Sequence, residues 1–371
     1  MTALRWNIAR LLAAGFALAG LLVTAAPGAA ASAAAAVPCV SMTGVQPPTP
    51  PNGGSPLNGV AVRSPCNAWA VGNSLTTVNN HRTLLSFIVH WDGASWTPSQ
   101  NPGVGDLLGA VAAISATSAW AVGTHLDSNG AAHTLIEHWD GTSWTQVASP
   151  SPGTGSTLRA VAATSATNAW AVGAFSDSGG SEQTLIEHWD GTSWTQVPSP
   201  SPGTLNGVIG IGWAVGQQTT SSGADQTVIE HWDGRKWSVV PGADLGSGST
   251  GSLAAVSATS PANIWAVGTL RASDGSAQDL IEHYDGTSWT QSASPGPGEL
   301  TGVSVTGASD AWAVGGSQIG QIVHYDGTSW TPVPSQPVGG LNAVSASSPA
   351  SVWAVGDGTP GPTLALHLRC C

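Results

Sequence analysis

Charged residues are scarce in this sequence. They make up 8% of the 371 residues, whereas 41% of the residues are hydrophobic and 48 are glycine. This composition is typical of a protein built from strands and turns, and it argues against a helical or a disordered chain. A chain of this length can also bury a large hydrophobic core.

Basic residues are the scarcest charged type. The chain has nine lysines and arginines against 21 acidic residues, and two of the nine, Arg5 and Arg10, lie near its start. Without that start, seven basic residues face 21 acidic ones, a formal charge of −14. Such a surface repels phosphate backbones and anionic lipid headgroups. The charge balance therefore argues against nucleic acid and membrane surfaces as partners.

Only the beginning of the chain carries a long apolar run, and no run of membrane-spanning length follows it. After Arg5 and Arg10 comes an apolar run over 11–26, followed by small residues that include a cleavage-like Ala31-Ser32-Ala33. This pattern predicts a secretory signal peptide over residues 1–33. An uncleaved anchor is the alternative, but the run is shorter than the roughly 20 residues that a spanning helix needs.

We therefore expect a mature domain over residues 37–371 that is secreted, extracellular and not inserted in a membrane.

Cysteines are few: Cys39, Cys66, Cys370 and Cys371. In an exported chain an even number of cysteines indicates disulfides, and four cysteines allow three pairings.

One string recurs along almost the whole chain. Near copies of the segment from Glu137 to Val147 (EHWDGTSWTQV) are centred on His90, His138, His188, His231, His283 and His324, and a broken copy lies at His367. In the third copy we predict strands over 158–165, 169–173, 184–190 and 194–197, separated by Gly, Asn, Asp and Pro turn signals. Four such strands favour an antiparallel meander.

The period of the repeat predicts the architecture. The tryptophans of the second strands are 41 to 52 residues apart, at Trp69, Trp120, Trp170, Trp213, Trp265, Trp312 and Trp353. This is the spacing of four-stranded blades in a β-propeller. The sequence thus predicts an all-β fold, a seven-bladed propeller of antiparallel blades.

The seventh unit stops after its third strand. The missing fourth strand lies at the other end of the mature chain, because 40–48 aligns with 192–200 and both segments lead to the first strand of the next unit. We expect the N-terminal segment to supply the outer strand of the last blade, which closes the ring. Blade four should be irregular, since Leu205 and Trp213 are only 8 residues apart.

The same alignment places Cys39 and Cys370 at one interrupted turn between third and fourth strands. A bond from Cys39 to Cys370 or Cys371 would lock the ring, and Cys66, in a turn beside the seam, is a partner for the remaining cysteine. Closing so long a loop contributes about 5 kcal/mol at the upper end of the chain-entropy estimate. Free or vicinal thiols are the alternative.

The repeated AWAVG and HWDGTSW strings resemble the Trp-rich repeats of secreted bacterial β-propellers with tectonin-like and kelch-like blades. The resemblance covers the chain from about Cys39 onward and implies the propeller fold. The chain lacks, as a repeated feature, the Gly-Gly pair that kelch blades carry after the second strand, and it lacks the Gly-His pair of WD repeats. Asp140 and Trp144 are four residues apart, whereas an Asp-box has five.

The repeated aromatic and histidine residues favour a structural role. Outside the N-terminal segment all 17 tryptophans occupy repeat positions, with Tyr284 and Tyr325 in two third-strand positions, so we expect them to pack between blades. A lectin-like protein with partly exposed fourth-strand tryptophans is the alternative. One histidine per blade places the histidines too far apart to share a metal ion. We expect His138 to join Asp140, Thr142 or Ser143 in a network across its hairpin.

The predicted channel lining offers no catalytic pair. The seven first strands contain no Asp, Glu, His or Cys, and their only charges are Arg63 and Arg159. A glycosidase or lyase acting there would need an acid and a base several ångströms apart. We therefore expect no catalytic residue, no metal site and no cofactor.

Polar residues that are not repeated gather in the loops between second and third strands, where a scaffold commonly carries its function. The candidate ligand-binding residues are His81, His125, Asp127, His133, Asp177, Glu182, Arg271 and Asp274. A solvated loop without ligand is the alternative. A Ca²⁺ site at Asp127 or Asp177 would lack a complete set of oxygen ligands.

The sequence favours a monomeric, non-catalytic recognition module that binds a glycan or an extracellular protein through this loop face. Two alternatives stay open at this point: a polysaccharide hydrolase or lyase that uses the loop residues, and a structural repeat protein without a specific ligand.

The cysteine pattern makes a testable prediction. In oxidised, secreted protein, Cys39 should be protected from a thiol label until a reductant is added, because its partner is Cys370 or Cys371. Mass spectrometry of labelled peptides measures this protection. Full labelling of Cys39 and Cys370 without reductant would contradict the disulfide closure.

Overall fold

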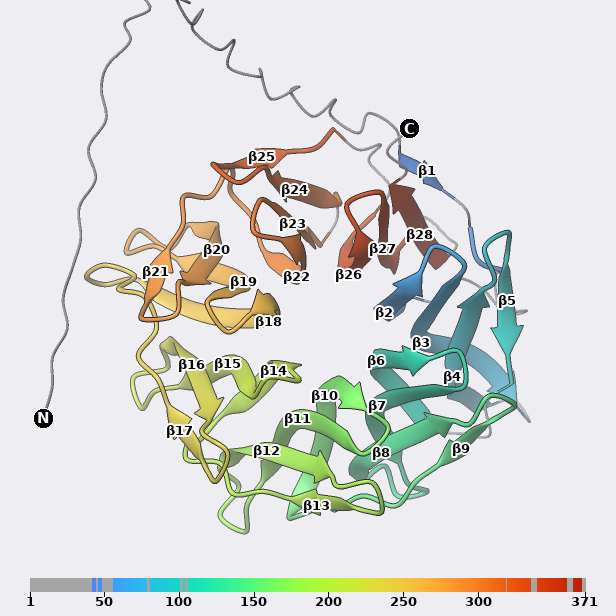
Figure 1. Cartoon of the computed structure of the whole chain (residues 1–371). Coiled ribbons are helices and arrows are strands. Elements are labelled where there is room, and N and C mark those ends of the chain that lie inside the picture. The colour runs from blue at the N-terminus through green and yellow to red at the C-terminus, as the bar shows by residue number, and fades with distance from the viewer. Residues whose placement is uncertain are drawn as a thin grey trace, which may run out of the picture. The chain divides into compact units, whose positions relative to one another are not determined.

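The computed structural model describes residues 42–44, 46–48, 56–78, 81–100, 103, 106–317, 319–334, 339–358 and 363–368. Residues 39–371 form one compact unit. The described residues contain strands and no helix, and the strands form seven sheets of four. Each sheet is one blade of a ring, with the innermost strands facing its centre (Figure 1). The predicted seven-bladed all-β propeller is therefore confirmed.

Each kind of strand occurs once per blade. The first, innermost strands are β2 (Leu57–Ser64), β6 (Asp106–Ser115), β10 (Thr154–Ser165), β14 (Thr204–Ile209), β18 (Thr250–Ser260), β22 (Leu300–Gly307) and β26 (Leu341–Ser348). The second strands are β3 (Asn67–Val78), β7 (Ser118–Leu126), β11 (Asn168–Ser176), β15 (Trp213–Thr219), β19 (Asn263–Arg271), β23 (Asp310–Gly315) and β27 (Ser351–Asp357).

The third strands are β4 (His81–Trp91), β8 (Ala132–Trp139), β12 (Glu182–Trp189), β16 (Asp225–Trp232), β20 (Ala277–Tyr284), β24 (Gln321–Tyr325) and β28 (Thr363–Leu368). The outer strands are β5 (Trp96–Ser99), β9 (Trp144–Gln146), β13 (Trp194–Gln196), β17 (Trp237–Val239), β21 (Trp289–Gln291), β25 (Trp330–Pro332) and β1 (Met42–Gly44). In the third blade the structure extends the predicted second and third strands into the loop between them.

The ring closes as the sequence predicts. β1 pairs antiparallel with β28 at the outer edge of the last blade (Figure 1). Thr43 lies opposite His367, just as Thr195 of β13 lies opposite His188 of β12, so the predicted alignment also gives the register. This fourth strand gives the last blade the same number of strands as the other six.

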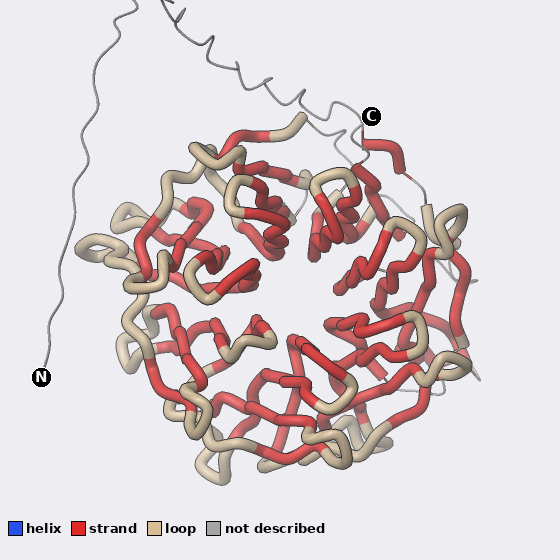
Figure 2. Tube along the Cα trace, in the orientation of Figure 1, coloured by secondary structure: helices blue, strands red, loops and turns tan. Residues whose placement is uncertain are grey.

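Blade four departs from its neighbours where the sequence predicts. Its first strand has 6 residues, against 12 in blade three. A turn at Gly210 to Gly212 then leads into β15, and Gly212 has a φ of +83°, a conformation that glycine adopts without steric cost. Figure 2 shows how loops and turns join the strands throughout the ring.

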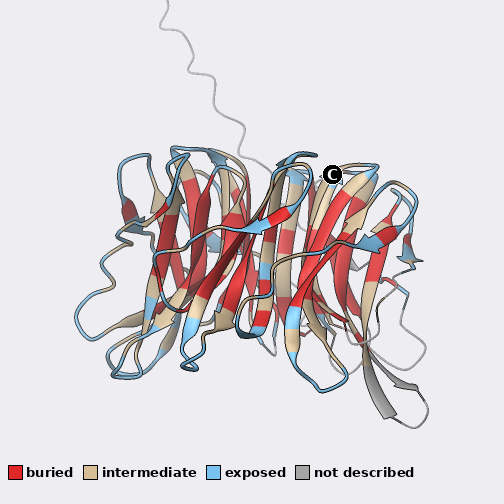
Figure 3. Ribbon diagram, turned by 90° about the horizontal axis from the view of Figure 1, so that it is seen from below, coloured by how far each residue is buried: buried red, intermediate tan, exposed pale blue. Residues whose placement is uncertain are grey.

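Aromatic side chains hold neighbouring blades together. Trp170 of blade three is 4% exposed, and its ring lies 5.2 Å from that of Trp232 and 5.1 Å, edge-on, from that of Trp237, both in blade four. Figure 3 shows the buried residues concentrated within the strands, with exposed residues in the loops. Edge-on aromatic pairs contribute about 0.5–1.5 kcal/mol beyond the burial of their surface.

The repeated histidine and aspartate belong to two separate networks. His138 Nε2 lies 3.1 Å from the Ser118 hydroxyl, and its ring lies 4.3 Å from that of Trp120. Asp140 Oδ1 instead accepts hydrogen bonds from the backbone N–H groups of Thr142 and Ser143 within its own turn. The expected hydrogen-bonded network of His138 with these turn residues is therefore wrong, because the ring turns toward the start of β7.

Four glutamates lie buried between blades, a feature that the sequence analysis missed. Blades two to five carry one each, in the third strand, at Glu137, Glu187, Glu230 and Glu282. Val89 and Val323 occupy this position in blades one and six. Glu187 is 0% exposed, neither of its carboxylate oxygens has a hydrogen-bond partner among the described residues, and burial raises its pKa to about 8. Burial also raises the pKa of Glu282, to about 7.

Replacing Glu187 should change how stability depends on pH. Because its pKa is raised from 4.5 to about 8, its contribution to stability is complete below about pH 4.5 and is lost as the pH rises toward 8. Glu187→Val, which copies blades one and six, should gain free energy of unfolding relative to wild type over this interval, by up to about 1.4 kcal/mol per pH unit. Urea unfolding at several pH values measures the difference. A difference that does not vary with pH would contradict the buried, protonated state.

Candidate functional site

The central channel opens on the face that carries the hairpins between second and third strands. Its mouth is a cavity of about 490 Å³ whose lining includes Asn73 and Thr124, and the second strands continue from these two residues into their hairpins. Further in, all seven first strands line a narrower space of about 170 Å³. The mouth therefore belongs to the loop face that the sequence analysis favoured.

A set of amide side chains fixes the inner strands around this mouth. Each follows the first leucine of its blade and donates a hydrogen bond of 2.9 Å to the matching leucine carbonyl of the next blade: Asn58 to Leu108, Asn206 to Leu253 and Asn342 to Leu57. These amides use their N–H groups to join blades. Their recurrence in the LNG and LNA strings was the signal that sequence reasoning passed over.

Arg159 occupies the same position in blade three but does not bridge to a backbone carbonyl there. Its guanidinium is exposed, and its one hydrogen bond among the described residues is a long contact of 3.5 Å from Nη1 to Asn206 Oδ1. Gly109 and Ala254 stand at this position in blades two and five, so little side-chain volume fills the mouth beside the guanidinium. Its remaining N–H groups are available to a ligand.

The loops place the predicted ligand-binding residues in separate hairpins. His81 begins β4 in blade one, His125, Asp127 and His133 belong to blade two, Asp177 and Glu182 to blade three, and Arg271 and Asp274 to blade five. His125, directly after Thr124 of the mouth, lies 2.7 Å from the buried Asp106 through its Nδ1. Only part of the predicted set therefore lies near the mouth.

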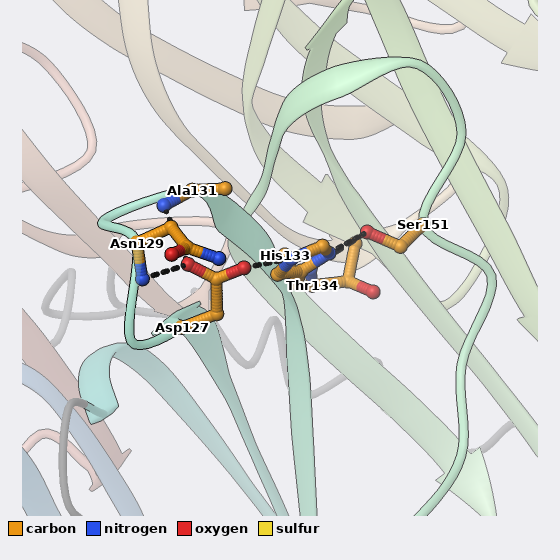
Figure 4. Close-up of polar contacts among 6 residues, drawn as sticks. All are labelled: Asp127, Asn129, Ala131, His133, Thr134 and Ser151. Atoms are coloured by element: carbon orange, nitrogen blue, oxygen red, sulfur yellow. Dashed lines mark hydrogen bonds and ion pairs between the residues drawn. The ribbon is translucent and has the colours of Figure 1, made fainter.

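Asp127 and His133 do meet, at the tip of the blade-two hairpin (Figure 4). His133 Nε2 lies 3.5 Å from Asp127 Oδ2, while Asp127 Oδ1 accepts hydrogen bonds from the N–H groups of Ala131 and Asn129. These backbone hydrogen bonds lower the pKa of Asp127 and favour its ionised form. An exposed carboxylate with a lowered pKa is poorly suited to act as a general acid.

Asp177 and Asp274 also accept hydrogen bonds from backbone N–H groups of their own hairpins. Asp177 Oδ1 accepts from the N–H groups of Ser181 and Gly179, and Asp274 Oδ1 accepts from that of Ser276. Their pKa values are lowered, by backbone hydrogen bonds at Asp177 and mainly by the Ser276 side chain at Asp274. All three aspartates therefore stabilise turns.

Arg271 lies in a small polar cavity of about 200 Å³ whose lining includes Asp225 of blade four and Glu299, just before blade six. Two carboxylates thus line the same cavity as this arginine, in contrast to the neutral lining around Arg159. Among the described residues no group of three or more His, Cys, Asp or Glu side chains is placed to hold a metal ion.

The fourth-strand tryptophans are buried, so the lectin-like alternative loses its basis. None is more than 5% exposed: Trp96, Trp144, Trp194, Trp237, Trp289 and Trp330. A ring that is packed between blades cannot stack on a sugar. The alternative of partly exposed outer-strand tryptophans is therefore wrong, and the expected packing between blades is confirmed.

Of the four cysteines, the structure describes Cys66. Cys66 is exposed in the turn between β2 and β3, as predicted, and forms no disulfide within the described part of the chain. Cys39, Cys370 and Cys371 lie outside the described residues, as does the predicted signal peptide. No described helix is long and apolar enough to cross a membrane.

Comparison with known proteins shows the fold. No protein-family model and no curated relative matches the chain. Among solved structures it is similar to YCF48 bound to D1 peptide, with a TM-score of 0.57, 18% identity, and coverage of 89% of this chain and 97% of that one. It is also similar to YCF48 from Cyanidioschyzon merolae (TM-score 0.55, 15% identity, 89% and 99% coverage). The WD40 β-propeller domain of Doa1 has a TM-score of 0.54, 10% identity, and coverage of 88% and 97%.

The turn-stabilising role of Asp127 can be tested. Asp127→Ala should speed hydrogen exchange at the amides of Asn129 and Ala131 several-fold, because both lose their acceptor. Exchange measured by NMR reports these amides individually, and Asp274→Ala is the matched control in another blade. Unchanged exchange in the blade-two hairpin would show that the carboxylate does not hold the turn.

Proposed function

We propose that this protein is a secreted, non-catalytic propeller that binds an acidic segment of an extracellular protein at the channel mouth. The observation that carries the proposal is the exposed Arg159 guanidinium, which stands in a cavity with otherwise neutral lining. The chain as a whole is acidic and repels anions, but no acidic residue lines this mouth. A cation at a concave opening attracts carboxylates locally and can hold one through two parallel hydrogen bonds.

The chemistry of the mouth supports binding rather than catalysis. Its lining consists of amides, hydroxyls, aliphatic groups and one guanidinium, without a carboxylate or an imidazole that could serve as acid or base. A propeller of the same fold, YCF48, has been solved with a bound peptide. That structure supports the view that this architecture can hold a peptide segment.

Secretion is part of the proposal and rests on the sequence. The pattern over residues 1–33 is that of a signal peptide, which would leave a propeller over 37–371 in the extracellular space. The resemblance to Trp-rich repeats of secreted bacterial propellers agrees with this location. We propose that the mature protein acts as a monomer.

The experiment measures binding of a fluorescein-labelled pentapeptide of aspartate and glutamate by fluorescence polarisation. Its uncharged asparagine and glutamine counterpart is the control probe. Arg159→Gln should weaken binding of the acidic probe about 10- to 100-fold, since a hydrogen bond to a charged group contributes about 1.5–3 kcal/mol. Arg235→Gln removes the same charge from an exposed turn outside the channel and should leave binding unchanged.

Two results would contradict the proposal. Equal affinity of Arg159→Gln and wild type for the acidic probe would show that the mouth does not bind it. Turnover of a polysaccharide by the mature protein, abolished by Asp127→Ala or Asp177→Ala, would instead establish the hydrolase or lyase alternative.

A further inference from the structure

Two residues depart from the repeat at the boundary between blades five and six. Asp279 of β20 lies at the position of Thr134, Thr184 and Thr227 in blades two to four. Gln321 of β24 lies opposite the glycine of AWAVG, at a position that is leucine in blades two, three and five. A charged and a polar side chain thus replace two residues of the repeat in adjacent blades.

These two side chains meet in the fold. Gln321 Nε2 donates a hydrogen bond of 2.6 Å to Asp279 Oδ2, and the Ser294 hydroxyl donates to the same oxygen at 3.1 Å. Asp279 is 1% exposed, and its Oδ1 has no hydrogen-bond partner among the described residues. Leaving an acceptor of a buried carboxylate without a partner costs about 1–3 kcal/mol or more, which a purely structural pair would not require.

The linker beside this pair also differs from that of blade three. There the linker pairs with the edge of β12, through a bridge between Gln183 and Pro202 and a hydrogen bond from Gly203 N–H to the Glu182 carbonyl. Among the described residues no corresponding backbone hydrogen bond joins the linker after β21 to the start of β20. A cavity of about 580 Å³ lies at this edge, against about 340 Å³ at the matching place in blade three.

The cavity has the chemistry of a cation site. Asp279 contributes to its wall, and the other lining residues are Gln278, Gln291, Ser292, Ala293, Ser294, Pro295, Gly296 and Pro297. Amide, hydroxyl and backbone oxygens are acceptors, and none of these residues is a cation. A buried carboxylate without a cationic partner focuses negative potential into the cavity beside it.

Gly298 keeps two further acceptors close together. A Cβ atom at this residue would lie 2.9 Å from Asp279 Oδ1 and 2.6 Å from Gln321 Oε1, so any side chain there would collide with both. The absence of a side chain lets the linker pass over the pair. Two acceptor oxygens therefore converge under the wall of the cavity.

We propose that this cavity binds an ammonium or guanidinium group, as carried by a lysine or arginine side chain of a partner protein. Such a group donates several hydrogen bonds and accepts none, which matches a wall of acceptors. A divalent metal ion commonly takes more carboxylate ligands than the single one present here. The site is separate from the channel mouth and does not depend on Arg159.

The test uses the mature protein labelled with ¹³C at aspartate side-chain carboxyls. The Asp279 resonance is assigned by its loss in Asp279→Thr, which copies blades two to four. The probes are the N-acetyl amides of lysine and arginine, with ε-acetylated lysine amide as the uncharged match and calcium chloride as the metal. Lysine and arginine probes should shift the Asp279 resonance saturably, whereas the uncharged probe should not.

Variants locate the site. Asp279→Thr should weaken binding of the lysine probe more than tenfold, and so should Asp279→Asn, the variant closest in shape to the wild type. Binding to both variants is measured from the backbone amide shifts of the linker. Gln321→Leu should weaken it as well, and Arg159→Gln should have no effect.

Three results would overturn the proposal. One is the absence of a saturable shift with either cationic probe up to its solubility limit. Another is a response to calcium without a response to the amines. The third is an Asp279→Thr variant with a higher free energy of unfolding in urea and wild-type affinity for the lysine probe. That result would show that Asp279 and Gln321 have a structural role only.

Discussion

The structure depends on the packing of one tryptophan per blade, which in six of the seven blades lies against aromatic residues of the next blade. Each second-strand tryptophan is buried, with a histidine of its own blade against its ring and, in blades one to three, two tryptophans of the following blade beside it. Aromatic rings of this size account for much of the buried surface between blades. Each blade packs mainly on its two neighbours, and β1 completes the last blade of the ring.

This constraint explains how much the sequence could predict. Residues that recur at the blade period include the tryptophans, the Asp-Gly turns and the strands, so the number of blades and the register of Thr43 against His367 followed from alignment alone. Both faces of a blade are buried, so alternation along a strand does not separate inside from outside. For this reason the buried position of Glu187 and the orientation of His138 could not be read from the repeat.

The candidate sites lie where the copies differ, but only the structure shows which differences matter. The sequence predicts Asp127 and Asp177 as ligand-binding residues, and the fold shows that each carboxylate also holds its own turn. Arg159 and Asp279 gain significance from what surrounds them, a neutral channel mouth and a buried pair with Gln321. Spatial neighbours of this kind come from different blades and cannot be inferred from spacing along the chain.

Function and scaffold thus share the same repeat. The second-strand tryptophans keep their residue type in all seven blades. Among the positions that vary between copies, one carries a cation at the channel mouth and another carries an acceptor beside a cavity. The central claim is that the mouth around Arg159 binds an acidic protein segment. Its most direct test is a crystal structure of the mature protein with the acidic pentapeptide. The account predicts a peptide carboxylate against the Arg159 guanidinium, whereas a peptide bound at the outer rim or on the opposite face would contradict it.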